Sequence, residues 1–303
     1  MYGKQREGTF FMSVELNISG HTHLVTLIGK PTGHSKSPAI HTISFKKCDV
    51  DAVFLAFDIE EEELPTVLDA MRAMNGWDGS SVTMPYKQKV IPLLDGLSDG
   101  ARLIGAVNTI VKTEDKKLIG HNTDGMGFIR NLRNHGATVE GATMTLVGPG
   151  GAGSGILVQG ALDGLAKLNV FARRGGKSYQ NVQTVIEKVR AETSCDVTLH
   201  AMEDLDDMKA CIAESSIVAN ATNVGMGEGC TDTPIPAEFL REGLYVADAI
   251  YLPEETQLLK NAKAAGAIPV PGVGMLNEQG AAAEVIWYGI EMPVDEVNAE
   301  VNG

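Results

Sequence analysis

Long apolar runs are missing from this chain of 303 residues. No stretch approaches the ~20 consecutive apolar residues that a membrane-spanning helix needs, so we expect no membrane partner. Between Met1 and Met12 the short apolar pair Phe10–Phe11 is too little for the apolar core of a signal peptide. We therefore expect a cytoplasmic protein in which residues 1–20 form an N-terminal arm.

An excess of basic residues is also missing. Lys and Arg number 25 against 39 Asp and Glu, which gives a formal net charge of −14. Nucleic-acid-binding proteins usually carry a basic face, so we expect no nucleic-acid partner. The four cysteines form no C-x-x-C pair and no zinc-like cluster with histidine. We therefore expect no metal site, and free thiols in a reducing compartment.

What the chain does contain is a regular alternation of strand-like and helix-like patterns before residue 136. A serine followed by proline, Ser37-Pro38, suits the cap and first turn of a helix. Gly136 suits the end of another. Strands are predicted at 24–28, 52–57, 80–82, 107–111 and 118–120, the last two as a hairpin, and helices at 37–45, 61–74 and 124–135.

A second series of alternating patterns begins at Thr143. The β-α-β-α-β order predicts a parallel sheet with helices on both faces. Strands are predicted at 144–147, 168–171, 197–200, 217–219 and 245–247. Helices are predicted at 156–165, 178–193, 257–265, 275–289 and 294–301, the first of them beginning around Ala152.

The length favours two domains of the α/β class. We expect an N-terminal α/β substrate-binding catalytic domain over 21–124. A Rossmann-type doubly wound domain is expected over 125–270, followed by C-terminal helices over 271–303 that pack back on the substrate domain. A homodimer is one assembly that these patterns leave open.

A glycine-rich turn over 148–155 connects a predicted strand to a predicted helix. Glycines at Gly148 and Gly150 allow a tight turn and close backbone approach, and N–H groups at the start of a helix bind a pyrophosphate. A plain loop is the alternative, but the strand before the turn and the helix after it favour a dinucleotide site.

The end of the next predicted strand bears on the choice of cofactor. An NAD enzyme usually has Asp or Glu there for the ribose 2′-hydroxyl, whereas this chain has Ala172, Arg173 and Arg174. Guanidinium groups suit a 2′-phosphate. We therefore favour NADP and keep NAD open, with a solvated basic turn as the alternative.

Two serines, a lysine and an aspartate stand out before residue 125. In an extended segment the hydroxyls of Ser35 and Ser37 would face the same way and could donate to a carboxylate. Lys87 follows a predicted strand, and Asp124 begins a predicted helix. Taken alone, Ser37 suits a helix cap, Lys87 an exposed side chain and Asp124 an N-terminal helix residue.

Seven strings combine these residues with others in one order along the chain. They are S-K-S-P, V-T-M-P-Y-K, G-A-V-N-T-I, N-T-D-G, G-P-G-G-A-G, N-A-T-x-V-G-M and G-V-G-M-L-x-x-Q. In this combination the chain resembles the shikimate dehydrogenase family from about Leu24 to Gly289. The stretch 159–165 and Met84 are closer to its quinate/shikimate branch.

The resemblance implies an NADP-dependent reduction of 3-dehydroshikimate to shikimate in chorismate and aromatic amino-acid biosynthesis. Lys87 would be the general acid/base, assisted by Asp124, with the substrate carboxylate on Ser35 and Ser37. Substrate contacts are also implied for Thr83, Asn108, Asp124, Tyr251 and Gln279. Cofactor contacts are implied for Gly148, Pro149, Gly150, Gly151, Ala152, Ala172, Arg173, Arg174, Thr222, Ala249 and Gly272.

Three positions depart from the family pattern. Ser81 and Ala172 stand where asparagine is common, and no acid follows Arg174. These differences leave open a quinate/shikimate dehydrogenase that uses NAD or NADP. A non-catalytic protein that senses dinucleotides is the remaining alternative, because a fold by itself does not establish catalysis.

Overall fold

The structure of the chain, a computed structural model, describes residues 17–302. Most of the predicted N-terminal arm, residues 1–16, therefore lies outside the described part. The chain separates into two compact units. Unit 1 comprises the chain up to Asn122 together with the chain from Gly280 onward, and unit 2 comprises Thr123–Gln279. Within the described residues, no helix combines the length and apolar character needed to cross a membrane.

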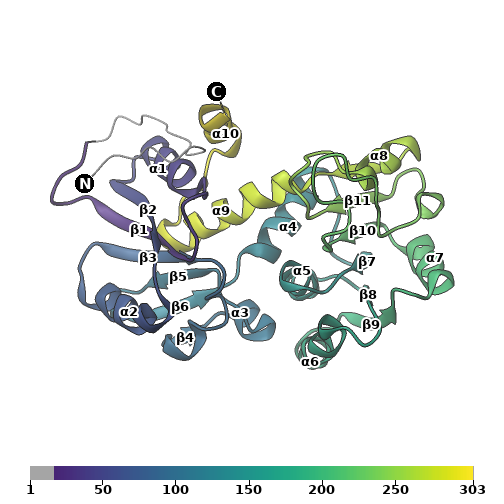
Figure 1. Ribbon diagram of the computed structural model, residues 1–303, viewed down its shortest axis with the longest axis horizontal. Coiled ribbons are helices and arrows are strands. Elements are labelled where there is room, and N and C mark those ends of the chain that lie inside the picture. The colour runs from purple at the N-terminus through teal and green to yellow at the C-terminus, as the bar shows by residue number, and fades with distance from the viewer. Residues whose placement is uncertain (1–16, 303) are drawn as a thin grey trace. The chain divides into compact units, whose positions relative to one another are not determined.

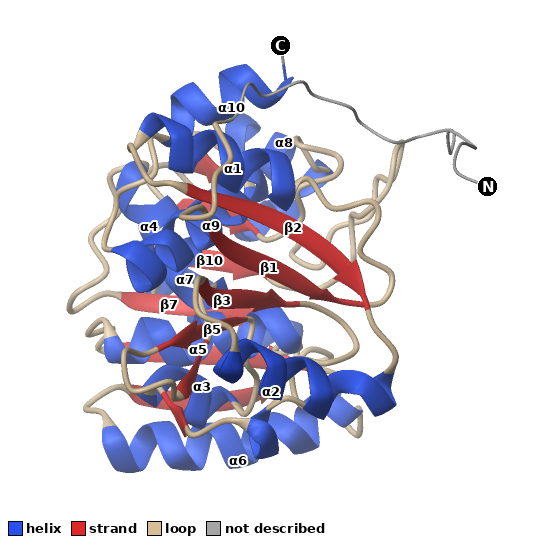
Figure 2. Cartoon of the chain, turned by 90° about the vertical axis from the view of Figure 1, so that its left-hand side faces the viewer, coloured by secondary structure: helices blue, strands red, loops and turns tan. Residues whose placement is uncertain are grey.

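Unit 1 contains a mixed sheet in the order β2-β1-β3-β5-β6-β4. Figure 2 shows β2, β1 and β3 side by side. These three strands are parallel, and β5 is antiparallel to both β3 and β6. The strands are β1 His23–Gly29, β2 Ala52–Asp58, β3 Trp77–Val82, β4 Gly96–Leu97, β5 Thr109–Lys112 and β6 Leu118–His121.

Helices cover both faces of this sheet. Val25 and Leu27 of β1 pack with Phe45 and Trp287 on one face. Ile28, which points the opposite way, packs in a second core with Leu68, Tyr86 and other residues. The helical segments are α1 Ser37–Lys47, η1 Glu61–Glu63, α2 Leu64–Ala73, η2 Ile91–Leu93, α3 Asp99–Ile104 and α10 Val294–Asn302.

Unit 2 contains a sheet in the order β9-β8-β7-β10-β11-β12, in which every neighbouring pair is parallel (Figure 1). This is the doubly wound dinucleotide-binding order, and the strand order reverses direction between β7 and β10. The predicted fold class is thereby confirmed. The strands are β7 Thr143–Val147, β8 Lys167–Ala172, β9 Asp196–Ala201, β10 Ile217–Asn220, β11 Tyr245–Asp248 and β12 Ile268–Val270.

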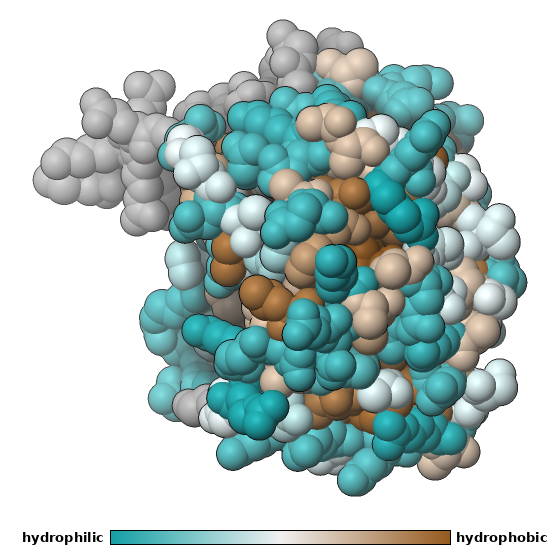
Figure 3. Space-filling view, turned by 90° about the vertical axis from the view of Figure 1, so that its right-hand side faces the viewer, coloured by the Kyte–Doolittle hydropathy of each residue, from teal (hydrophilic) through white to brown (hydrophobic). Residues whose placement is uncertain are grey.

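Helices also flank the sheet of unit 2. The inner faces of α7 and α8 pack on Val147, Phe171 and Val246. Figure 3, viewed from the side that carries α7 and α8, shows mainly hydrophilic atoms with scattered hydrophobic patches, as amphipathic helices require. The helices are α4 Asp124–Asn134, α5 Gly151–Leu162, α6 Lys177–Glu192, α7 Leu205–Glu214, η3 Ala237–Phe239, α8 Gln257–Ala264 and α9 Gly272–Tyr288.

Helix α9 begins in unit 2 and ends in unit 1. Its C-terminal half is fixed within unit 1, because Trp287 Nε1 donates to the Ile110 carbonyl at 3.0 Å. A Cβ on Gly79 would lie 2.6 Å from Trp287 Nε1, so only glycine allows the ring this close to β3. Glu284 is fully buried and bonds His41 at 2.7 Å and Ser44 at 2.5 Å. These contacts join α1 to α9.

One helix start and one helix end differ from the sequence predictions. The cap of α1 is Lys36, and Ser37 is the first helical residue, so the prediction of Ser37 as cap was wrong. Helix α5 begins at Gly151, within one residue of the predicted start around Ala152. It ends at Leu162, because Gly164 takes a φ of 89°, so the predicted end at Leu165 was too late.

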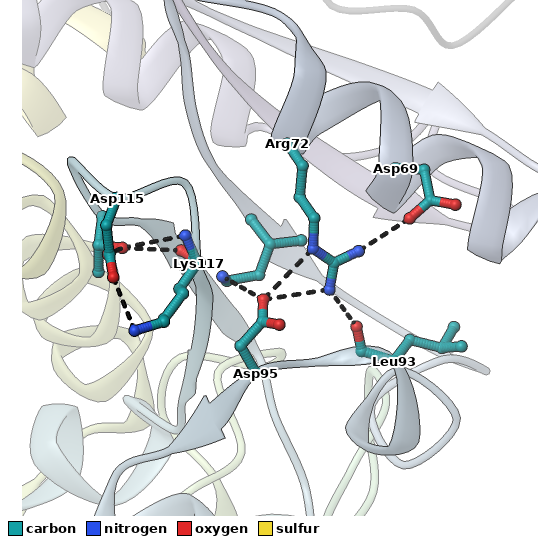
Figure 4. Close-up of polar contacts among 8 residues, drawn as sticks. Asp69, Arg72, Leu93, Asp95, Asp115 and Lys117 are labelled. Carbon is teal, nitrogen blue, oxygen red and sulfur yellow. Dashed lines mark hydrogen bonds and ion pairs between the residues drawn. The ribbon is translucent and has the colours of Figure 1, made fainter.

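A polar network joins α2 to Leu93 and Asp95, which precede β4. Figure 4 shows the Arg72 guanidinium between the carboxylates of Asp69 and Asp95. Arg72 also donates to the Leu93 carbonyl at 2.6 Å, and Asp95 accepts the Leu118 N–H at 2.8 Å. The Leu118 N–H and the Arg72 guanidinium lower the pKa of Asp95 from 3.8.

We expect Asp95→Asn to reduce the free energy of unfolding at pH 7 by about 1 kcal/mol, a modest value because exposed charges are screened. A lowered pKa stabilises the fold above pH 3.8, and that stability is lost as the pH falls through the folded-state pKa. Urea unfolding should show that the free energies of unfolding of the wild type and the variant converge in that acidic range. Asp69→Asn is the matched control and should change the free energy of unfolding little. A constant difference across pH would contradict the role of the Asp95 charge.

Candidate functional site

The substrate-side residues of unit 1 lie along one edge of its sheet. The carboxyl ends of β1, β3 and β6 meet there, and antiparallel β5 begins at the same edge. Ser35 and Ser37 follow β1, and Thr83 and Lys87 follow β3. Asn108 immediately precedes β5. The topology thus brings five of the predicted site residues to one edge.

Backbone hydrogen bonds fix the position of Lys87 relative to Asn108. The Lys87 carbonyl accepts the Val107 N–H at 2.7 Å. The Asn108 carbonyl accepts the Val82 N–H at 2.7 Å, and the Asn108 N–H donates to His121 at 3.0 Å. Lys87 is half-buried and Asn108 is buried. An ammonium and an amide are therefore held on neighbouring rigid segments.

The turn after β1 is tied to the Thr83–Lys87 segment. The Thr83 N–H donates to the Ile28 carbonyl at 3.0 Å, and the Lys30 N–H donates to the Met84 carbonyl at 3.1 Å. A Cβ on Gly29 would collide with Thr83. Glycine at this position therefore allows the two segments to pack together.

The two serines are not arranged as the sequence suggested. Lys36 has helical dihedrals, φ −84° and ψ −9°, so the segment is not extended. Ser35 Oγ instead accepts the Ser37 N–H at 3.2 Å. Both serines are half-buried. The expectation that an extended backbone aligns their hydroxyls was wrong, because the helix has already begun at Ser37.

His121, at the end of β6, borders the same edge. Burial lowers the pKa of its imidazole below 6.5, so the ring is neutral at physiological pH. Asn122, the next residue, is buried and donates to the Ala106 carbonyl at 3.2 Å. Neither residue was predicted to have a role. The signal in the sequence was that Asn122 begins N-T-D-G and His121 directly precedes it.

Asp124 and Gln279 are held together within unit 2. Asp124 is the first residue of α4, and the preceding Thr123 donates to Gln279 Oε1 at 3.4 Å. A Cβ on Gly127 would lie 2.5 Å from the Gln279 N, so α4 packs directly on α9. On another side, Gly125 packs against Gly155 of α5. Glycines therefore determine how closely the helix that begins with Asp124 approaches its neighbours.

The predicted cofactor residues of unit 2 all lie at or directly beyond the carboxyl ends of parallel strands. This edge, next to the reversal between β7 and β10, is where open α/β sheets bind their ligands. Residues 148–152 follow β7, 172–174 end and follow β8, and Thr222 follows β10. Ala249 and Tyr251 follow β11, and Gly272 follows β12. Tyr251 is 53% exposed.

The glycines of the turn after β7 fall into two classes. Gly148 has a φ of 91°, and a Cβ there would collide with Thr222. A Cβ on Gly150 or Gly151 would meet no protein atom within 4 Å, and Gly150 has an ordinary φ of −75°. The fold therefore requires glycine at Gly148 but not at the other two. Open space above a bare helix N-terminus fits a pyrophosphate that approaches the backbone closely.

A buried network supports Thr222. Asn220 Oδ1 accepts both the N–H and the hydroxyl of Thr222, at 2.9 and 2.7 Å. Asn220 donates to Asp248 at 3.0 Å, and Asp248 also accepts from Thr256 at 2.7 Å. Burial raises the pKa of Asp248, which these hydrogen bonds oppose. Asn220 and Asp248 were not predicted to have roles, although Asn220 begins the string N-A-T-x-V-G-M and Asp248 directly precedes Ala249.

Comparison with known proteins decides the family. A shikimate dehydrogenase of Listeria innocua, named as NADP(+)-dependent, is 43% identical over 92% of this chain and 96% of its own length. This chain belongs to the shikimate dehydrogenase family. A family profile described as the shikimate dehydrogenase substrate binding domain matches residues 27–110.

Solved structures of the family share the fold. A shikimate 5-dehydrogenase of Listeria monocytogenes, in complex with shikimate and NAD, has a TM-score of 0.89 at 41% identity, covering 94% of this chain and 98% of that one. A quinate dehydrogenase of Corynebacterium glutamicum, in complex with NAD, has a TM-score of 0.79 at 30% identity, with coverage of 92% and 98%. Solved proteins named as a shikimate dehydrogenase and as a quinate dehydrogenase therefore share this fold.

The two glycine classes make a paired prediction for this family member. Gly150→Ala should leave the thermal midpoint unchanged but weaken NADPH binding at least about tenfold, because a methyl group blocks the backbone approach. Gly148→Ala should destabilise the fold by about 1–3 kcal/mol through backbone strain and collision with Thr222. Thermal unfolding and NADPH fluorescence titration measure the two effects. Unimpaired NADPH binding by the first variant would contradict the assigned cradle.

Proposed function

We propose that this protein catalyses the reversible NADPH-dependent reduction of 3-dehydroshikimate to shikimate, a step of aromatic amino-acid and chorismate biosynthesis. The observation that carries the proposal is the convergence of Ser35, Ser37, Thr83, Lys87 and Asn108 on one sheet edge. The identity to dehydrogenases over nearly the whole chain supports the same reaction.

NADPH, when bound, supplies the hydride for the ring carbonyl. Negative charge develops on the carbonyl oxygen, so a positioned acid is needed. Lys87 donates a proton to that oxygen, and its ammonium stabilises the developing charge. In the oxidative direction the Lys87 amine accepts the hydroxyl proton. Asp124 is assigned to assist Lys87 in this proton transfer and to bind a ring hydroxyl.

The remaining polar residues determine how the substrate is held. Ser35 and Ser37 donate to its carboxylate, since both hydroxyls precede or begin the first turn of α1, where negative charge is favoured. Asn108 is buried, and its amide therefore has little freedom to turn away from a ring hydroxyl. Thr83, Tyr251 and Gln279 bind further hydroxyl groups.

The cofactor residues follow from the edge of the second sheet. Residues 148–152 hold the pyrophosphate, and Ala172, Arg173 and Arg174 line the adenosine ribose. Thr222, Ala249 and Gly272 lie on the nicotinamide side. A Cβ on Gly272 would lie 2.7 Å from the Asp248 carbonyl, so a larger residue would displace this part of the site. NADP is the preferred cofactor, and NAD is the second.

Location and assembly are part of the proposal. All four cysteines are free thiols, which is typical of a reducing compartment, and we assign the protein to the cytoplasm. Its partner is a small carboxylated ring compound rather than nucleic acid or a membrane. We retain a homodimer as the assembly to test by light scattering.

Quinate is the second candidate substrate. Quinate has an additional hydroxyl at the carboxylated carbon, where the shikimate ring has a double bond, so the volume of the site decides between them. Ser81, which is half-buried, stands where asparagine is common and leaves more room. The fold shared with a quinate dehydrogenase supports testing both compounds.

The decisive assay combines shikimate or quinate with NADP or NAD and follows nicotinamide absorbance. We expect the largest kcat/KM with shikimate and NADP. A larger value with quinate would reassign the substrate. The lack of turnover with all four pairs would favour a protein that only binds dinucleotides.

Lys87→Ala should lower kcat by about 10²–10⁴, the usual range for loss of a general acid/base. NADPH affinity should not change, because Lys87 is assigned to the substrate. Steady-state kinetics and NADPH titration measure the two quantities separately. The exposed Lys89, two residues further on and paired with Glu61, provides the control Lys89→Ala. Near-normal turnover of the Lys87 variant would refute the assignment.

Ser35→Ala should raise KM for shikimate by about tenfold, since one hydrogen bond to a charged carboxylate is lost. Binding of NADPH should remain unchanged. Because Ser35 Oγ also accepts the Ser37 N–H, thermal unfolding must accompany the kinetics. If the substitution instead weakened NADPH binding, the positions assigned to the two ligands would be reversed.

A further inference from the structure

The end of β8 lacks the acid that usually binds an NAD ribose, but the neighbouring strand provides one. Strands β8 and β9 are parallel neighbours, with Ala172 of β8 paired to Ala201 of β9. Two residues after β9 comes Glu203, which is exposed. The carboxylate of Glu203, which follows β9, thus reaches the edge of the sheet where β8 ends.

Hydrogen bonds place this carboxylate at the turn after β8. The Arg174 N–H donates to both oxygens of Glu203, at 3.2 and 3.3 Å. The Met202 N–H donates to the Ala172 carbonyl at 2.9 Å, so the backbone before Glu203 is fixed against β8. The position of the acid relative to the arginine turn is therefore defined by backbone contacts.

An open surface depression lies beside this contact. It has a volume of about 390 Å³ and is lined by Arg174, Glu203, Asp204, Leu205 and Asp206. A carboxylate has about four acceptor positions, and one N–H shared between both oxygens leaves acceptor capacity. Glu203 can therefore accept from a hydroxyl group while it still holds the Arg174 backbone.

We propose that Glu203 binds the 2′-hydroxyl of the adenosine ribose of NAD and thereby allows this enzyme to use NAD alongside NADP. The inference rests on the proposed dehydrogenase function. Dinucleotide domains bind the adenosine ribose beside the end of their second strand, which here is β8. A carboxylate there favours the 2′-hydroxyl of NAD over the 2′-phosphate of NADP. Arg173 and Arg174 have the opposite preference. The acid and the arginines together support dual use.

The test compares wild-type enzyme with Glu203→Ala, Glu203→Gln and Asp206→Asn. Dissociation constants for NADH and NADPH are measured by fluorescence titration without substrate. The alanine variant should bind NADH about tenfold more weakly and NADPH no more weakly, because a charged hydrogen bond is lost and repulsion of a phosphate is removed. The glutamine variant keeps an oxygen for the Arg174 N–H. It should shift the ratio of the NADH and NADPH dissociation constants in the same direction as the alanine variant.

Asp206→Asn is the matched control. It removes one charge from the same depression. It should leave the ratio of the NADH and NADPH dissociation constants within about twofold, since Asp206 has no contact with the arginine turn among the described hydrogen bonds. Unchanged ratios in both Glu203 variants would overturn the proposal, as would an equal shift in the control. So would a wild-type enzyme that binds NADPH but not NADH. Because binding is measured without turnover, failure of the shikimate assay is a separate result.

Discussion

The structure depends on one constraint, which is that parallel strands direct their carboxyl ends to the same edge of a sheet. Loops at that edge bring together residues that are distant in sequence, whereas the strands themselves only pack. In unit 2 this constraint collects the turns after β7, β8, β10, β11 and β12. In unit 1 it acts on β1, β3 and β6, and the reversed direction of β5 adds Asn108 to the same edge.

Close packing at glycine positions makes these edges rigid. Gly29 allows Thr83 to approach β1, and Gly148 allows Thr222 to approach the glycine-rich turn after β7. Gly150 differs, because the protein leaves space there that a ligand can fill. Glycines in one short string can therefore serve folding at one position and ligand approach at the next. Only three-dimensional neighbours separate the two roles.

Most regular elements were predictable because periodicity is a local property. The predicted strands 24–28 and 144–147 and the predicted helix beginning at Asp124 agree with the structure within one or two residues. Short elements were missed. Strand β12 has three residues and contains Pro269, and α3 has six residues, so neither presents enough repeats to establish a period. The cap of α1 was misassigned because serine before proline describes a preference, not a geometry.

The sequence by itself determined the α/β class, the glycine turn, the arginines after β8 and membership of a dehydrogenase family, because these depend on the order of residues along the chain. Tertiary structure alone decided which strands are neighbours. It placed Trp287 against Gly79, joined His41 to Glu284, and brought Glu203 to the Arg174 N–H. Such contacts depend on packing between segments far apart in the chain, and no local pattern specifies their partners.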